Sequence, residues 1–219
     1  MNFDLGQLAI YAVPFLLAIT FHELAHGWVA RLRGDRTAEM QGRLTLNPLS
    51  HLDPAGTLAF ILTSLIPGGI AFGWAKPVPV NYFNLERPKR DMIFVAGAGP
   101  GANLLLAFAA GLLYLLVGEP GGSGFHPLWS PITLMLRAAI GVNAMLAVFN
   151  LIPLPPLDGG RVLVGLLPVR AAMAVERIEP YGVMILFLLI MVGIVNQVVG
   201  PLTWVTIRFV MRLAVAVVG

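Results

Sequence analysis

Long apolar stretches separated by short polar loops dominate this chain. About 20 apolar residues are needed to cross the hydrocarbon core of a bilayer as a helix. Five stretches approach or exceed that length: 8–32, 91–117, 132–150, 182–199 and 202–218. A shorter apolar stretch, 56–70, ends in Pro67-Gly68-Gly69. The pattern predicts an all-α polytopic membrane protein with about five transmembrane helices, a re-entrant segment at 56–70 and a small extended or hairpin element.

Composition supports this class. Of the 219 residues, 58% are hydrophobic and 11% are charged, whereas soluble domains average about 45–50% and about 25%. At this length we expect one membrane domain, residues 1–219, whose partner is the lipid bilayer. The net charge of +3 does not suggest nucleic acid, because the basic residues cluster in short loops and act as topology signals. No cysteine is present, so any metal must be held by histidine and carboxylate.

The basic residues also predict orientation. Arg31, Arg33, Arg36 and Arg43 follow the first apolar stretch, and such an excess marks the cytoplasmic side of a membrane. A second basic group, Lys76 to Arg90, follows 56–70, and it would lie outside if that stretch crossed fully. A re-entrant segment at 56–70 therefore fits the charge distribution better than a full crossing. We expect a multi-pass protein of the cell membrane.

The first apolar stretch contains a His-Glu-x-x-His motif, His22 to His26. Residues four apart lie on one face of a helix, so the two imidazoles can bind one metal ion. Glu23 lies on the adjacent flank, where its carboxylate can reach a water held by that metal and act as general base. Two histidines and a glutamate in lipid would be costly without a function. The motif therefore predicts a catalytic zinc site near the cytoplasmic side.

A catalytic zinc keeps three protein ligands, so a third must come from elsewhere. The segment 150–161 contains three prolines in four positions, which break the helix at membrane depth. Its carboxylate, Asp158, is the best candidate for the third ligand. Asp53 is the main competitor, although a turn or helix N-cap is its favoured interpretation. Asn150 could donate to the developing oxyanion.

The stretch 72–81 cannot be helical, because Pro77 and Pro79 remove donors and fix an extended backbone. It is either a linker or an extended clamp, centred on Lys76, Pro77, Val78 and Pro79, that pairs with a substrate backbone. Asn103 is a further polar candidate for the site, although a helix–helix hydrogen bond is its favoured role.

Three blocks, 21–26, 73–81 and 150–161, resemble the site-2 proteases, a family of intramembrane zinc metalloproteases, and they occur in the family's order. The resemblance implies zinc bound by His22, His26 and Asp158, with Glu23 catalytic and Asn150 helping to hold the substrate or oxyanion. It also implies cleavage in or near a transmembrane helix of another protein. Family members often have a span before the zinc-binding helix or an inserted PDZ domain. This chain resembles a compact form with neither.

The sequence thus predicts an intramembrane endopeptidase that takes part in regulated intramembrane proteolysis. Two alternatives stay open. A metal-ion transporter could use the same His and Asp ligands, but it would not need Glu23 as a base. An inactive relative that only binds membrane helices would not need His22 or Asp158.

Overall fold

Four long helices form the frame of the molecule in the computed structural model, which describes residues 5–64, 74–118 and 130–219. Parts of two predicted elements lie outside the described residues: residues 65–70 of the re-entrant segment and residues 72–73 of the extended clamp. The helices, with two 3₁₀ turns (η), are α1 (Leu5–Leu32), α2 (Thr37–Met40), η1 (Pro48–His51), α3 (Pro54–Ser64), η2 (Tyr82–Asn84), α4 (Pro88–Val117), α5 (Ser130–Asn150), α6 (Asp158–Leu166), α7 (Val169–Glu176), α8 (Glu179–Met191) and α9 (Ile194–Val218).

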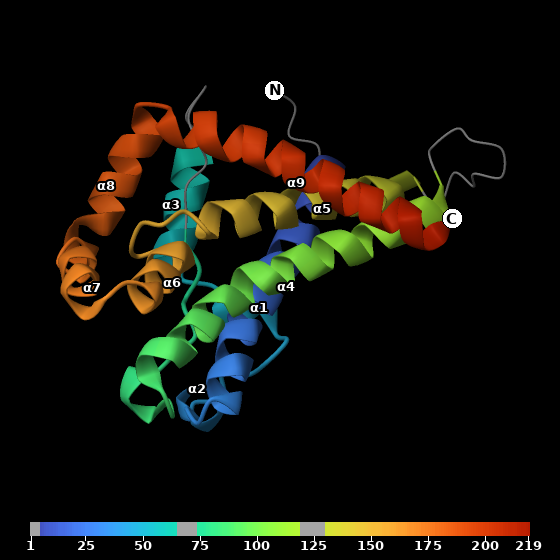
Figure 1. Ribbon diagram of the computed structural model, residues 1–219. Coiled ribbons are helices and arrows are strands. Elements are labelled where there is room, and N and C mark those ends of the chain that lie inside the picture. Colours follow the sequence, from blue (N-terminus) through green and yellow to red (C-terminus); the bar gives the residue numbers. More distant parts are fainter. Residues whose placement is uncertain (1–4, 65–73, 119–129) are drawn as a thin grey trace.

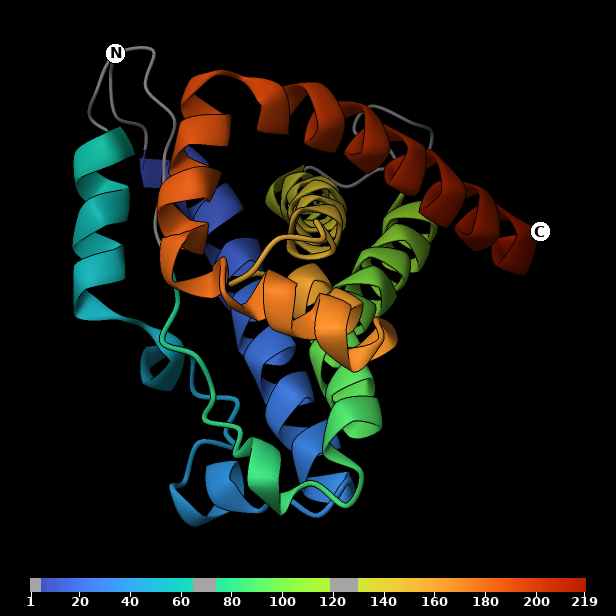
Figure 2. The same ribbon diagram turned by 60° about the vertical axis from the view of Figure 1, so that its left-hand side comes forward.

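Helix α5 lies at the centre of the bundle. It packs against α1, α4 and α9, and Figure 2 shows it nearly end-on between them. Small side chains allow this close approach: Ala18 of α1, Ala107 of α4, and Ala144 and Ala147 of α5 are all fully buried. Lipid tails are as apolar as the side chains, so close packing of small residues is what holds such helices together. The expected all-α membrane architecture is confirmed.

Within the described residues, four helices are long and apolar enough to cross a membrane: Ile10–Leu32 within α1, α4, α5 and α9. The stretch 182–199, predicted as a fifth span, does not form one continuous helix, because α8 ends at Met191 and α9 begins at Ile194. Helix α8 has 13 residues, about 20 Å of helix, which is shorter than the roughly 30 Å hydrocarbon core.

The boundary between the last two helices also differs from the prediction at Gly200-Pro201. The chain breaks at Gly193, whose φ of +84° is a left-handed conformation that glycine adopts without steric cost. Pro201 lies inside α9. Figure 1 shows α9 running across the other helices, with α8 turning away from its start.

The extended segment 74–81 connects the shorter elements to α4. It has no helix, as the prolines predict, and one antiparallel bridge joins Leu52 to Ala75. Helix α3, which begins the predicted re-entrant segment, stands at the edge of the bundle in Figure 2. The extended segment 74–81 runs beside the second half of α1, where Val78 bonds to Glu23, and leads by way of η2 to the start of α4.

Candidate metal centre

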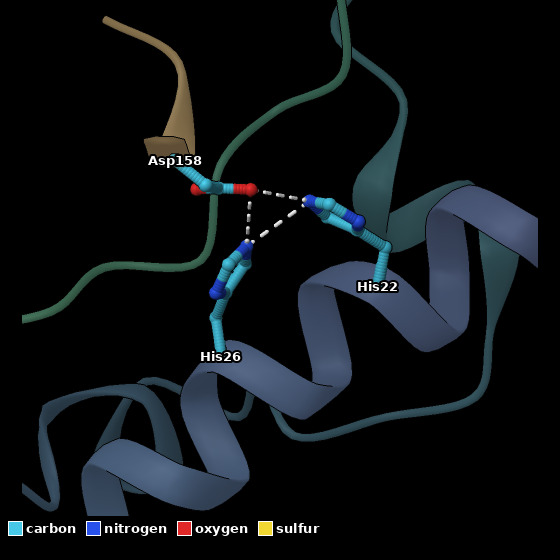
Figure 3. A group of neighbouring side chains, drawn as sticks. All are labelled: His22, His26 and Asp158. Carbon is cyan, nitrogen blue, oxygen red and sulfur yellow. Dashed lines mark hydrogen bonds and ion pairs between the residues drawn. The ribbon is translucent and has the colours of Figure 1, made fainter. Parts of the chain in front are cut away.

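His22 and His26 lie on one face of α1, as their spacing predicts. Both side chains are buried, and their ring centroids are 4.7 Å apart. Their Nε2 atoms point the same way and lie 3.0 Å from each other. Figure 3 shows the two rings projecting from consecutive turns of the helix toward the third member of the group.

Asp158 supplies the carboxylate of this group. The prolines end α5 at Asn150, and hydrogen-bonded turns such as Leu154 N–H to Ile152 O, 2.7 Å, carry the chain back to α6. Asp158 is the first residue of α6. Its Oδ2 lies 3.0 Å from His22 Nε2 and 3.3 Å from His26 Nε2 (Figure 3). Asp158 thus meets His22 and His26 at one point of the bundle, although it lies 136 and 132 positions after them in the sequence.

Hydrogen bonds from α4 and its neighbours determine which ring nitrogens carry a proton. His22 Nδ1 lies 2.6 Å from Asn103 Oδ1, and His26 Nδ1 lies 2.7 Å from the carbonyl of Val95. The Asn103 amide nitrogen donates to Ala18 O and Asn143 Oδ1, so its Oδ1 must be the acceptor. Both Nδ1 atoms therefore donate, and in the neutral rings both Nε2 atoms present lone pairs.

Three acceptor atoms thus converge without a hydrogen between them. Asp158 Oδ2 is buried and has no hydrogen-bond donor, which is costly unless a cation satisfies it. The three ligand atoms lie within 4.8 Å of one another. Their separations of 3.0–3.3 Å match the roughly 3.3 Å expected between neighbouring ligands of a tetrahedral zinc with bonds of about 2.0–2.1 Å. The group fits a zinc ion.

One stripe of α4 supports both histidines. Val95, Gly99 and Asn103 follow at intervals of four residues, and we call them the α4 stripe. Val95 and Asn103 bind the two Nδ1 atoms. A methyl group added to Gly99 would lie 2.6 Å from Cε1 and Nε2 of His22, and closer still to Nε2 of His26. Gly99 therefore makes room for both rings, a role that the sequence pattern alone does not reveal.

Glu23 faces the extended segment. Its Oε2 accepts a hydrogen bond of 2.8 Å from the backbone N–H of Val78. Lys76 is exposed, and its N–H donates to His51 O over 2.9 Å. The predicted clamp thus lies against α1 beside the motif.

The other predicted residues lie as follows. Asn103 forms the expected helix–helix hydrogen bond with Asn143 and also binds His22. The Asn150 amide donates to Leu146 O within its own helix, 3.0 Å. Asp53 accepts from Gly56 N–H, 2.8 Å, which is the predicted cap at the start of α3. It does not belong to the histidine group.

Helices of membrane-spanning length that enclose a His₂-Asp group define a metal centre within a membrane protein. Comparison with known families agrees: the model of peptidase family M50 matches residues 10–134 and 125–193. Among curated proteins, "Putative zinc metalloprotease YwhC" of Bacillus subtilis is 35% identical over 202 residues, 92% of this chain and 89% of the relative. "Putative zinc metalloprotease Rip2" of Mycolicibacterium smegmatis is 29% identical over 192 residues, which cover 88% of this chain and 70% of the relative. No solved structure matches significantly.

The chain therefore belongs to peptidase family M50, the site-2 protease family. It is a zinc metallopeptidase of the membrane, and no PDZ domain is evident among the residues that the structure describes.

Proposed function

We propose that this protein is an intramembrane endopeptidase that hydrolyses a peptide bond in or near a transmembrane segment of another membrane protein, as in regulated intramembrane proteolysis. In this proposal His22, His26 and Asp158 hold the zinc, and Glu23 is the general base. The observation that carries it is the convergence of three buried ligand atoms within 4.8 Å, with a carboxylate on the residue next to the first ligand.

Zinc in such a site supplies a Lewis acid that lowers the pKa of a bound water and polarises a carbonyl. The protein's own residues would do the rest. Glu23 would accept the proton that the attacking water loses and return it to the leaving amine. Asn103 would keep the proton of His22 on Nδ1, so that Nε2 stays free for the metal. Asn150 remains the candidate donor to the oxyanion, which requires its amide to turn away from Leu146 O.

The substrate would arrive from the lipid phase and unwind beside the extended segment 74–81. The carbonyl groups of a helix are bonded internally, so the scissile carbonyl is reachable only after local unwinding. Arg31, Arg33 and Arg36 at the end of α1 support a cytoplasmic location for this end of the helix, in the cell membrane. The metal centre would then be nearer the cytoplasmic side, where water can enter.

The test compares zinc content and proteolysis in the wild type, Glu23→Gln, Asp158→Ala and the matched control Asp53→Ala. The substrate is a labelled peptide with one apolar helix of about 20 residues that a central Asn-Gly pair weakens. We expect Glu23→Gln to retain zinc but not cleave, and Asp158→Ala to lose both. Asp53→Ala, which changes only the cap of α3, should retain both.

Each variant can overturn a different assignment. Wild-type cleavage by Glu23→Gln would show that Glu23 is not the base. A metal-ion transporter with the same ligands would instead bind zinc without cleaving the peptide, in the wild type as in the variants. Wild-type zinc content in Asp158→Ala, or zinc loss in Asp53→Ala, would refute the ligand set. Cleavage by variants that lack zinc would refute the metal-dependent mechanism altogether.

A further inference from the structure

Val78 joins the extended segment to α1 through both its backbone and its side chain. Its backbone N–H donates to Glu23 Oε2 over 2.8 Å, and its side chain is buried. That side chain lies over Gly27, one turn after Glu23: a methyl group added to Gly27 would come within 2.8 Å of Val78 Cγ1. Backbone and side chain of Val78 therefore fit the same two turns of α1.

Hydrogen bonds on both sides of Val78 fix the segment in place. On one side, Arg43 Nη2 donates to the carbonyls of Lys76, 3.0 Å, and Pro77, 3.3 Å. On the other side, Asn81 N–H donates to Asp35 Oδ2 over 2.6 Å, and Asp35 is fully buried. The donor that faces Glu23 thus belongs to a backbone held at both ends.

Because prolines lie on both sides of Val78, its N–H has no neighbouring backbone donor. Pro77 and Pro79 have no N–H and restrict the backbone to extended conformations. Lys76 N–H is already bonded to His51 O, and Val78 N–H is bonded to Glu23. Residues 76–79 therefore have no unused N–H for a substrate strand, and the donor of Val78 is directed at the carboxylate.

We propose that Val78 is a positioning residue for Glu23, through its backbone N–H. The proposal rests on the proposed function, in which Glu23 is the general base. A free glutamate side chain samples several rotamers. A charge-assisted hydrogen bond to one carboxylate oxygen restricts that freedom and leaves the other oxygen to take up the proton. The segment 74–81 would then act first on the enzyme's own base, before any contact with substrate.

The direct test replaces the Val78 amide by an ester, with α-hydroxyisovaleric acid incorporated by a suppressor tRNA in cell-free translation into vesicles. This exchange removes the N–H and keeps the side chain. The same exchange with the same acid at Val80 is the matched control. Using the labelled single-helix peptide described above, we expect kcat to fall roughly 10- to 100-fold at position 78, as for loss of a bond to a charged group. KM and zinc content should stay within twofold of the wild type, and the ester at 80 should leave all three unchanged.

A second test displaces the segment by substitution. Gly27→Ala places a methyl group against Val78 Cγ1 and against Leu44 Cδ2, which is the end of a flexible side chain. We expect it to lower kcat with zinc retained. Adding Val78→Ala removes Cγ1 but keeps the backbone N–H, so the double variant should recover most of the lost kcat. A general defect of α1 would not be rescued in this way.

The outcomes separate this inference from the function on which it rests. Wild-type kcat in the ester variant, while Glu23→Gln is inactive, would overturn the inference and leave the function intact. A raised KM with unchanged kcat would also overturn it, because the donor would then serve the substrate. Full activity of Glu23→Gln would instead refute the role of Glu23 as base.

Discussion

Gly99 offers the sharpest test of the metal centre, because one added methyl group should dismantle it. In Gly99→Ala the new Cβ would lie 2.6 Å from Cε1 and Nε2 of His22, whereas ordinary contact begins near 3.4 Å. To remove the overlap, the rings or the helix must therefore move by about 0.8 Å at His22 and by about 1.0 Å at His26, whose Nε2 would lie closer still to the new Cβ. The same methyl group overlaps His26 Nε2 as well, so turning one ring does not relieve it.

That displacement is large on the scale of metal binding. Ligand distances in a functioning site stay within about 0.2 Å of their ideal values, at most about a quarter of the required shift. A misplacement of about 1 Å can reduce function about 100-fold. We therefore expect Gly99→Ala to bind zinc at least about 100-fold more weakly than the wild type, a loss of roughly 2.7 kcal/mol.

The assay is a competition titration with a chromogenic zinc chelator on purified protein in detergent. Gly97→Ala is the matched control, because a methyl group there meets no atom within 4 Å. It should bind zinc like the wild type, and the helical circular dichroism of both variants should match it. Zinc affinity of Gly99→Ala within threefold of the wild type, or equal losses in the two variants, would refute the proposed geometry.

Two further predictions concern groups around the site. Asn103→Ala removes the acceptor of His22 Nδ1–H and should weaken zinc binding about 10- to 100-fold, whereas Asn143→Ala leaves that bond intact and should cost less than about threefold; equal losses in the same titration would contradict the role of Asn103. Burial alone would raise the pKa of Asp35, but hydrogen bonds from Thr37, Asn84 and the backbone of Asn81 hold it below its ordinary value. Its contribution to stability is therefore present above its unfolded pKa of about 3.9 and is lost as the pH falls through the lower folded value. Asp35→Asn should cost about 1–3 kcal/mol at pH 7, or about 3–10 °C in Tm. The difference in Tm should shrink below about pH 4, and a difference independent of pH between 7 and 3 would show that the charge of Asp35 does not matter.

The sequence was sufficient for the parts of the site that follow from local geometry. A spacing of four residues places His22 and His26 on one face whatever the rest of the chain does. Prolines at 153, 155 and 156 end α5 because they cannot continue a helix, which is also a local effect. A carboxylate at such a break inside a membrane protein is costly without a function, which made Asp158 a candidate ligand. The two histidines therefore needed no knowledge of how the helices pack, and Asp158 was already preferred over Asp53 as the third ligand.

The remaining contacts depend on how distant segments approach one another. Val95 takes part through its carbonyl and Val78 through its N–H. Nearly every residue has these backbone groups, so the residue type does not indicate such a role. Gly99 resembles any small residue of a membrane helix until the histidines are seen against it. The last helix break could not be located either. Gly200-Pro201 is the stronger local signal, but the break lies at Gly193, after which Val195 and Val199 of α9 pack in one cluster with Leu186 and Ile190 of α8.

The α4 stripe has a consequence for which changes in chain length the protein can tolerate. The spacing of Val95, Gly99 and Asn103 matches the histidine pair on α1: Val95 binds His26, Gly99 leaves room for both rings, and Asn103 binds His22. Inserting or deleting one residue rotates everything beyond it by about 100°. Such a change between 95 and 103 would turn one histidine's partner away while keeping the other. We expect this nine-residue stretch to accept substitutions that spare Gly99 and Asn103, such as Gly97→Ala, but no change in its length.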